Sequence, residues 1–188
     1  MMPRSRGKAR TAAAGRWACT ADCGPAPDVA IRPIESADES FLWDMLYEAI
    51  HVPEGEPAPP RDIVQLPELA RYVRDWGRAG DYGFIAIDGA SGRACGAAWL
   101  RLLIGDDRGY GYVDERTPEL AIAVLPECRG RGVGTRLLDR LLRSERCETP
   151  VCLSVSSDNP AMRLYERFGF RVVDGAGDSV TMLREGDT

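Results

Sequence analysis

The segment from Pro118 to Leu142, PELAIAVLPECRGRGVGTRLLDRLL, constrains the fold more than any other part of the chain. It reads as a short apolar strand, a break at Pro126, a glycine-rich loop and a leucine-striped helix. This order gathers several main-chain N–H groups at a helix N-terminus, where hydrogen bonds and the helix dipole favour an anion such as a diphosphate. Three loop glycines permit close approach, since a Cβ would hold the phosphates away: Gly130, Gly132 and Gly134.

Two other phosphate-binding loops do not fit this segment. A Rossmann G-x-G-x-x-G pattern needs a glycine where Thr135 stands, and a Walker loop needs a Gly-Lys-Ser/Thr sequence that is absent. A glycine loop that only turns a corner stays open as an alternative for the segment taken alone.

Apolar periodicity divides the rest of the chain into strands and helices that predict one α/β domain over residues 29–188. Ser36 and Glu39 have the spacing of a capping box, and the sequence DGASG after residue 87 has the glycines of a hairpin turn. We expect a mixed sheet with helices on both faces. The expected strands are 29–32, 82–87, 94–103, 120–124, 151–155, 170–173 and 179–183, and the expected helices are 36–50, 69–76, 137–142 and 161–168.

Residues 1–28 lack apolar periodicity and are rich in Arg, Ala, Gly and Pro. Such a segment buries too little surface to offset its ordering entropy, so we expect a disordered arm. Its basic residues either contact an acidic partner or are simply solvated.

The net charge of −5 argues against nucleic acid or an anionic membrane as a partner, and no apolar run reaches the length of a membrane span. Six cysteines without a CxxC pair favour a reduced, cytoplasmic protein. His51 is the single histidine, which leaves too few ligands for a zinc site, so we expect no metal. No nucleophile motif surrounds His51, and we interpret it as a helix-end or surface residue.

Two motifs together carry a family resemblance. RGRGVG, residues 129–134, is similar to the R/Q-x-x-G-x-G/A diphosphate signature of the GNAT N-acetyltransferase superfamily. NPAMRLYERFGF, residues 159–170, resembles the N-x-A-x-x-L-Y-x-x-x-G-F segment that follows the next strand in that family, at the expected distance. With the flanking elements, the resemblance extends from Val29 to about Leu183.

The resemblance implies a mostly antiparallel sheet of about six or seven strands in which one parallel pair splays apart to admit acetyl-CoA. It implies transfer of the acetyl group to a primary amine of a small molecule or protein, by direct attack in a ternary complex. A non-catalytic acyl-CoA-binding module on the same fold is the alternative, and a homodimer is a candidate assembly. The implied coenzyme contacts are Ile122, Ala123, Val124, Arg129, Gly130, Arg131, Gly132, Val133, Gly134, Thr135, Asn159 and Tyr165.

Tyr165 and Glu119 are the catalytic candidates. Tyr165 lies on the same helical face as Ala161, Leu164 and Phe168, and this position alone favours a core tyrosine. The motif match instead assigns it as the general acid toward the thiolate. Glu119 resembles the glutamate that many members place near the start of this strand, where it shares a face with two small residues, Ala121 and Ala123. A solvated strand-end carboxylate is its alternative. Asn159 is expected both to cap the last helix and to contact the coenzyme.

The acceptor amine is expected between the first helix with its following loop and the connection before residue 119. Carboxylates interleaved with tyrosines suit an ammonium group through charge and cation–π contacts. The alternative is that these polar residues only keep exposed loops soluble. The candidates are Glu54, Glu56, Tyr110, Tyr112, Asp114 and Glu115.

Overall fold

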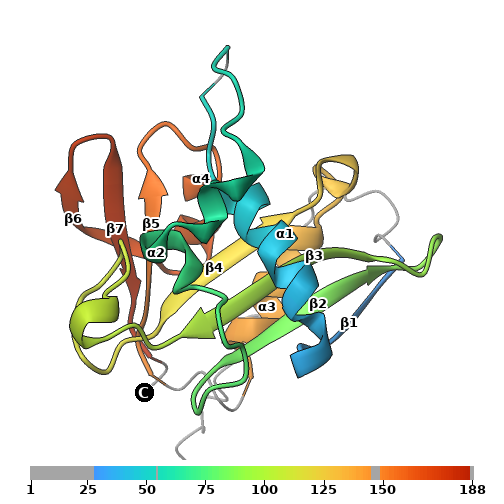
Figure 1. The fold of residues 1–188 in the computed structure, drawn as a ribbon, viewed down its shortest axis with the longest axis horizontal. Coiled ribbons are helices and arrows are strands. Elements are labelled where there is room, and N and C mark those ends of the chain that lie inside the picture. The colour runs from blue at the N-terminus through green and yellow to red at the C-terminus, as the bar shows by residue number, and fades with distance from the viewer. Residues whose placement is uncertain (1–27, 54, 145–148, 187–188) are drawn as a thin grey trace, which may run out of the picture.

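The computed structural model describes residues 28–53, 55–144 and 149–186. Its strands form one seven-stranded sheet in the order β1-β2-β3-β4-β5-β7-β6 (Figure 1). The strands are β1 (Val29–Pro33), β2 (Tyr82–Asp88), β3 (Ala94–Arg101), β4 (Glu119–Val124), β5 (Val151–Ser156), β6 (Arg171–Ala176) and β7 (Ser179–Arg184). The helices are α1 (Glu39–Ala49), α2 (Pro67–Ala70), α3 (Val133–Leu142) and α4 (Met162–Arg167), with short 3-10 turns η1 (Ser36–Asp38), η2 (Arg61–Gln65), η3 (Gly105–Asp107) and η4 (Pro126–Cys128). The mixed sheet and the predicted order of elements are confirmed.

The pairing of β4 with β5 is the feature that shapes the site. These strands run parallel, and their register contains one pair, Glu119 with Cys152, whereas the other neighbouring strands pair antiparallel. Beyond that pair β4 stays with β3 and β5 stays with β7, so the two strands diverge. The carboxyl half of β4 thus borders an opening in the sheet, as the family resemblance implies.

Helices cover both faces of the sheet, and each face has its own apolar core (Figure 1). Leu137, Leu138 and Leu141 of α3 are fully buried on one face. Leu42 and Met45 of α1 are fully buried on the other. Burying a leucine completely contributes about 2 kcal/mol, so the stripes that predict these helices also fix their orientation. No helix in the described part of the chain is both long and apolar enough to cross a bilayer.

The capping box before α1 is shifted by one residue from its prediction, and α1 begins at Glu39, three residues after the predicted start. Asp38, not Glu39, provides the capping carboxylate, which accepts the N–H of Glu35 at 2.8 Å. Arg32 of β1 binds the same carboxylate at 2.6 and 2.8 Å and thereby holds it at the helix entrance. This ion pair lowers the pKa of Asp38, and η1 precedes α1 as a result of the shifted cap.

The predicted helix over 69–76 is also shorter than expected. α2 ends at Ala70, and the chain continues as turns to Asp75, whose φ is 57°. Arg101 of β3 explains this ending, because its guanidinium donates to the carbonyls of residues 71, 74 and 75 at 2.9, 2.8 and 3.2 Å. Asp81 neutralises this buried cation at 2.6 Å. Tyr72, Val73 and Trp76 are nevertheless buried, as the apolar pattern predicts.

Candidate active site

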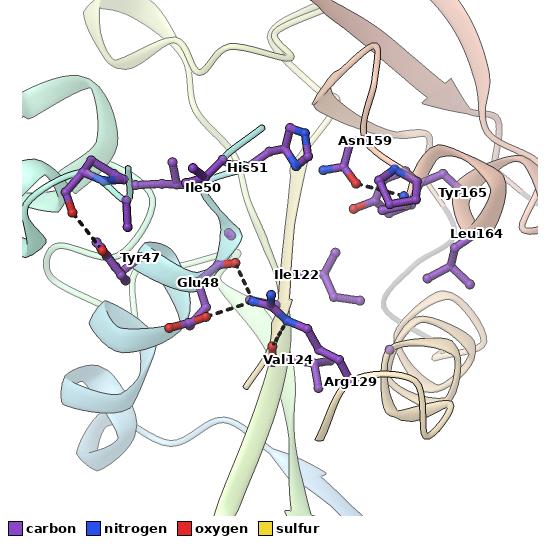
Figure 2. Close-up of a pocket in the computed structure, with 18 residues that line it drawn as sticks. Tyr47, Glu48, Ile50, His51, Ile122, Val124, Arg129, Asn159, Leu164 and Tyr165 are labelled. Carbon is purple, nitrogen blue, oxygen red and sulfur yellow. Dashed lines mark hydrogen bonds and ion pairs between the residues drawn. The ribbon is translucent and has the colours of Figure 1, made fainter. Parts of the chain in front are cut away.

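A cleft of about 660 Å³ lies where β4 and β5 diverge. One wall is the end of α1 with its following loop, and the other is the start of α4. Figure 2 shows Tyr47, Glu48, Ile50 and His51 on the first side, Asn159, Leu164 and Tyr165 on the second, and Ile122, Val124 and Arg129 between them. The lining consists of residues 47–52, 58–59, 122–124, 129, 134, 159–161 and 164–165.

The glycine loop reaches this cleft with the geometry that the sequence predicts. Gly130 and Gly132 have φ values of 72° and 76°, a conformation that side chains with a Cβ disfavour. A Cβ built on either residue would meet nothing within 4 Å. These two glycines are therefore not required by a close protein neighbour, and the space beside them is open. Among the described residues no side chain caps α3, which begins directly after Gly132. The loop therefore presents free N–H groups and room for a diphosphate.

The two arginines of the loop differ in where their side chains go. Arg131 turns away from the loop to Asp88 at the end of β2, at 2.8 Å. Hydrogen bonds from Ser91 and the charge of Arg131 lower the pKa of Asp88. Arg129 turns into the cleft, where its Nε donates to the carbonyl oxygen of Val124 at 2.9 Å (Figure 2). Of the two guanidinium groups, only that of Arg129 lines the cleft.

Tyr165 lies in the apolar core and also borders the cleft. Its ring is 8% exposed and packs edge-on against Phe170, with 6.0 Å between ring centroids, so it belongs to the core. The same residue lines the cleft. Burial raises the pKa of its phenol to about 12, so the hydroxyl keeps its proton at neutral pH. Asn159 accepts the N–H of Ala161 at 2.9 Å in the turn before α4, and it also lines the cleft. The N-cap position of α4 is Ala161, so Asn159 stabilises the preceding turn and not the predicted cap position.

Glu119 is placed at the one β4–β5 pair, and it is outside the lining of the cleft. The residue is 3% exposed, and its Oε1 accepts the hydroxyl of Tyr72 at 2.7 Å and the N–H of Gly111 at 2.8 Å. Its Oε2 is buried without a hydrogen-bond partner. Burial raises the pKa of this carboxyl, although both hydrogen bonds oppose the shift. A buried carboxylate with one free oxygen is a group that can take up a proton.

The predicted acceptor residues do not gather in the cleft. Glu54 lies outside the described residues, and Glu56 is exposed on the loop after α1. Tyr112 donates to Glu115 at 3.0 Å and stacks under Arg108, while Asp114 accepts the N–H groups of residues 116 and 117. Tyr110 is 60% exposed. None of the five described candidates lines the cleft, and the loop before β4 instead makes contacts within itself.

Among the cleft-lining residues that sequence reasoning missed, three have polar side chains: Tyr47, Glu48 and His51. His51 follows Ile50, the C-cap residue of α1, close to its predicted helix-end position. Its Nε2 is buried and lies 3.1 Å from Oδ1 of Asp158, without the geometry of a hydrogen bond. Glu48 lies in the last turn of α1, off the buried stripe of Leu42, Met45 and Leu46, and this periodicity is the signal that could have placed it on the wall. His51 follows the extended residue Ile50 beyond the helix, so helical spacing gives no such signal for it. Within the described residues, no group of three or more His, Cys, Asp or Glu side chains is arranged to hold a metal.

Parallel strands that diverge beside a glycine-rich helix N-terminus are the two fold features that the family resemblance predicts. Residues 79–172, half of the chain, match the family model described as an acetyltransferase (GNAT) domain. The chain therefore belongs to the GNAT acetyltransferase family.

Curated relatives match over most of their own length. One is the 5-NmdU N-acetyltransferase of Pseudomonas phage PaMx11, 25% identical over 72% of this chain and 99% of that protein. Another is the glucosamine 6-phosphate N-acetyltransferase of Trypanosoma brucei brucei, 28% identical over 77% of this chain and 90% of that protein. These relatives are named N-acetyltransferases.

Solved structures share the fold. YncA from Salmonella typhimurium, solved with its cofactor acetyl-CoA, superimposes with a TM-score of 0.60 at 23% identity, covering 86% of this chain and 95% of that one. A spermidine N-acetyltransferase chimera of Vibrio cholerae SpeG and human SSAT has a TM-score of 0.54 at 21% identity, covering 84% of this chain and 95% of that one. At these identities the likeness concerns the fold.

Proposed function

We propose that this chain transfers the acetyl group of acetyl-CoA to a primary amine of a small molecule or protein, by direct attack in a ternary complex. The observation that carries the proposal is one cleft that joins three features: the opening beside β4, the uncapped glycine-rich end of α3, and the buried phenol of Tyr165. The relatives named above as N-acetyltransferases support the reaction class.

The coenzyme fits the cleft by the groups that line it. The amides of residues 129–135 would hold the diphosphate, although that of Arg129 already donates to the carbonyl oxygen of Pro126 at 3.2 Å. The main chain of residues 122–124 would pair with the pantetheine arm as a substitute strand. Asn159 would contact the coenzyme from the other wall. When bound, acetyl-CoA supplies an acetyl group activated as a thioester.

Tyr165 is proposed as the general acid. As the amine nitrogen bonds to the acetyl carbon and the carbon–sulfur bond breaks, the leaving sulfur gains a negative charge that a proton neutralises. The phenol is available for this step because its raised pKa keeps it protonated throughout the neutral range. The nitrogen must lose a proton as well, so a second group is required.

Glu119 is proposed as the group that finally takes that proton. Because the carboxyl lies under Tyr72 and outside the cleft lining, the proton would reach it through the Tyr72 hydroxyl or a water relay. Its free Oε2 offers the accepting position.

Glu119→Gln tests this role through the pH dependence of the reaction. Burial raises the pKa of Glu119, so the carboxyl remains protonated to a higher pH than an ordinary glutamate near 4.3, and activity that needs the carboxylate falls as pH falls through that raised pKa. We expect kcat/KM to drop by about 10- to 100-fold and the acid limb of its pH profile to disappear. An unchanged limb in Glu119→Gln would remove Glu119 from the mechanism. Glu68→Gln, on the exposed surface of α2, is the control and should behave as wild type.

A thiol-release screen tests the activity itself. Acetyl-CoA is incubated with the protein and one amine at a time, including glucosamine 6-phosphate, spermidine, amino acids and peptide N-termini, and free coenzyme thiol is measured. We expect thiol release that depends on both the amine and the protein. If acetyl-CoA binds but no amine in a broad panel releases thiol, the chain is instead a coenzyme-binding module without turnover.

A further inference from the structure

Arg129 forms a bridge between the α1 wall of the cleft and strand β4. Besides the 2.9 Å contact from its Nε to the carbonyl oxygen of Val124, its Nη2 donates to the carboxylate of Glu48 at 2.9 Å and approaches the carbonyl oxygen of the same residue at 3.5 Å (Figure 2). Glu48 belongs to the last turn of α1, so the bridge joins the α1 wall to β4. The side chain of Glu48 is 14% exposed, whereas that of Arg129 is 54% exposed.

The bridge occupies atoms that the proposed function needs for other contacts. The carbonyl of Val124 belongs to the stretch that would pair with the pantetheine arm, and Arg129 begins the loop that would hold the diphosphate. The guanidinium of Arg129 also neutralises Glu48, which is the only carboxylate side chain among the described residues that line the cleft. Coenzyme binding and the state of Glu48 are therefore linked through one side chain.

We propose that Glu48 is the residue that binds a positive charge of the acceptor, and that Arg129 holds Glu48 until the coenzyme takes the guanidinium away. This inference rests on the proposed function. A diphosphate carries more charge than one carboxylate and accepts hydrogen bonds in the forked geometry of arginine, so it competes well for Arg129. Glu48 is then left mostly buried and unpaired, a state that a second cation relieves.

The chemistry of the attack indicates which charge Glu48 binds. The reacting nitrogen must be a free base, and a carboxylate beside it would instead stabilise its ammonium form. The cation at Glu48 is therefore a second positive group of the acceptor, separate from the nitrogen that is acetylated. The acceptor class that follows is a diamine, polyamine or other amine with an additional cationic group.

Calorimetric titration of the full chain tests the exchange, with coenzyme A and 1,4-diaminobutane as the probes. In wild type, coenzyme A should raise the affinity for 1,4-diaminobutane by about 5- to 20-fold, and the diamine should raise the affinity for coenzyme A by the same factor. n-Butylamine, which lacks the second charge, should show no such coupling.

Two variants separate the partners of the bridge. Glu48→Gln should bind coenzyme A more tightly than wild type, because no ion pair has to break, and should lose the coupling to the diamine. Arg129→Gln leaves Glu48 without its partner, so 1,4-diaminobutane should bind equally well with and without coenzyme A. Asp44→Asn removes a carboxylate of the same helix that pairs with an exposed arginine, Arg61 at 3.2 Å, and should behave as wild type.

The outcomes distinguish this inference from the proposed function. If wild type binds coenzyme A but the diamine shows the same affinity in its presence and absence, or Glu48→Gln leaves both affinities unchanged, the exchange between Arg129 and Glu48 is wrong while the acetyltransferase proposal stands. If coenzyme A does not bind wild type, the proposed function itself fails.

Discussion

Replacing Tyr165 by phenylalanine should lower kcat for amine-dependent thiol release by about 100- to 1,000-fold, the range typical of losing a general acid. The ring stays in place, because its contacts with Phe170 and the core do not involve the hydroxyl. The leaving sulfur then departs without a proton donor, and this penalty appears in the chemical step. Acetyl-CoA should bind Tyr165→Phe with nearly unchanged affinity, as measured by calorimetric titration.

Tyr82→Phe is the matched control for this result. Tyr82 also packs its ring edge-on against a phenylalanine, Phe84 at 5.2 Å between centroids, but it lies on β2 away from the cleft. Its variant should retain wild-type kcat. Full activity in Tyr165→Phe would show that another group protonates the sulfur.

Gly132→Val should reduce the affinity for acetyl-CoA by about 100-fold, equivalent to about 2.7 kcal/mol of binding free energy. The substitution has two separate effects, one on stability and one on coenzyme affinity. The left-handed backbone, with φ of 76°, costs an L-residue about 1–2 kcal/mol and is hardest for a β-branched one. The valine side chain also projects into the open space at the start of α3, where the diphosphate is expected. Titration calorimetry gives the affinity, and a thermal melt gives the loss of stability.

Gly177→Val separates the two effects. Gly177 has a φ of 63° in the turn between β6 and β7, and a Cβ there also meets nothing within 4 Å. Both variants should lose a similar amount of stability, because the backbone strain is alike. Only Gly132→Val should lose affinity for the coenzyme. Equal affinities in the two variants would mean that the diphosphate is held somewhere else.

The sequence predicts the fold well where the signal is local. The leucine stripe of α3 and the apolar strands on either side can be recognised within short windows of sequence, and the structure confirms the order of elements and the sheet with helices on both faces. The glycine loop is equally local, since φ at Gly132 follows from the turn that starts α3. α2 is shorter than predicted because its end depends on Arg101, a residue about 30 positions away in the sequence.

The site is predicted only in part, for the same reason. The coenzyme-side residues belong to two compact motifs, and the structure places Gly134, Asn159 and Tyr165 together in the cleft. The acceptor side depends on side chains that meet across long stretches of sequence, such as Glu48 with Arg129. The burial of Glu119 beneath Tyr72 is another such contact. Periodicity within one helix or strand contains no information about these partners.

An NMR titration of isotope-labelled protein with acetyl-CoA would show whether the glycine-rich loop holds the diphosphate. We expect the amide signals of residues 129–135 to move most on adding the coenzyme, together with those of residues 122–124 on β4. Saturable binding that shifts other amides and leaves residues 129–135 unmoved would overturn the proposed coenzyme site.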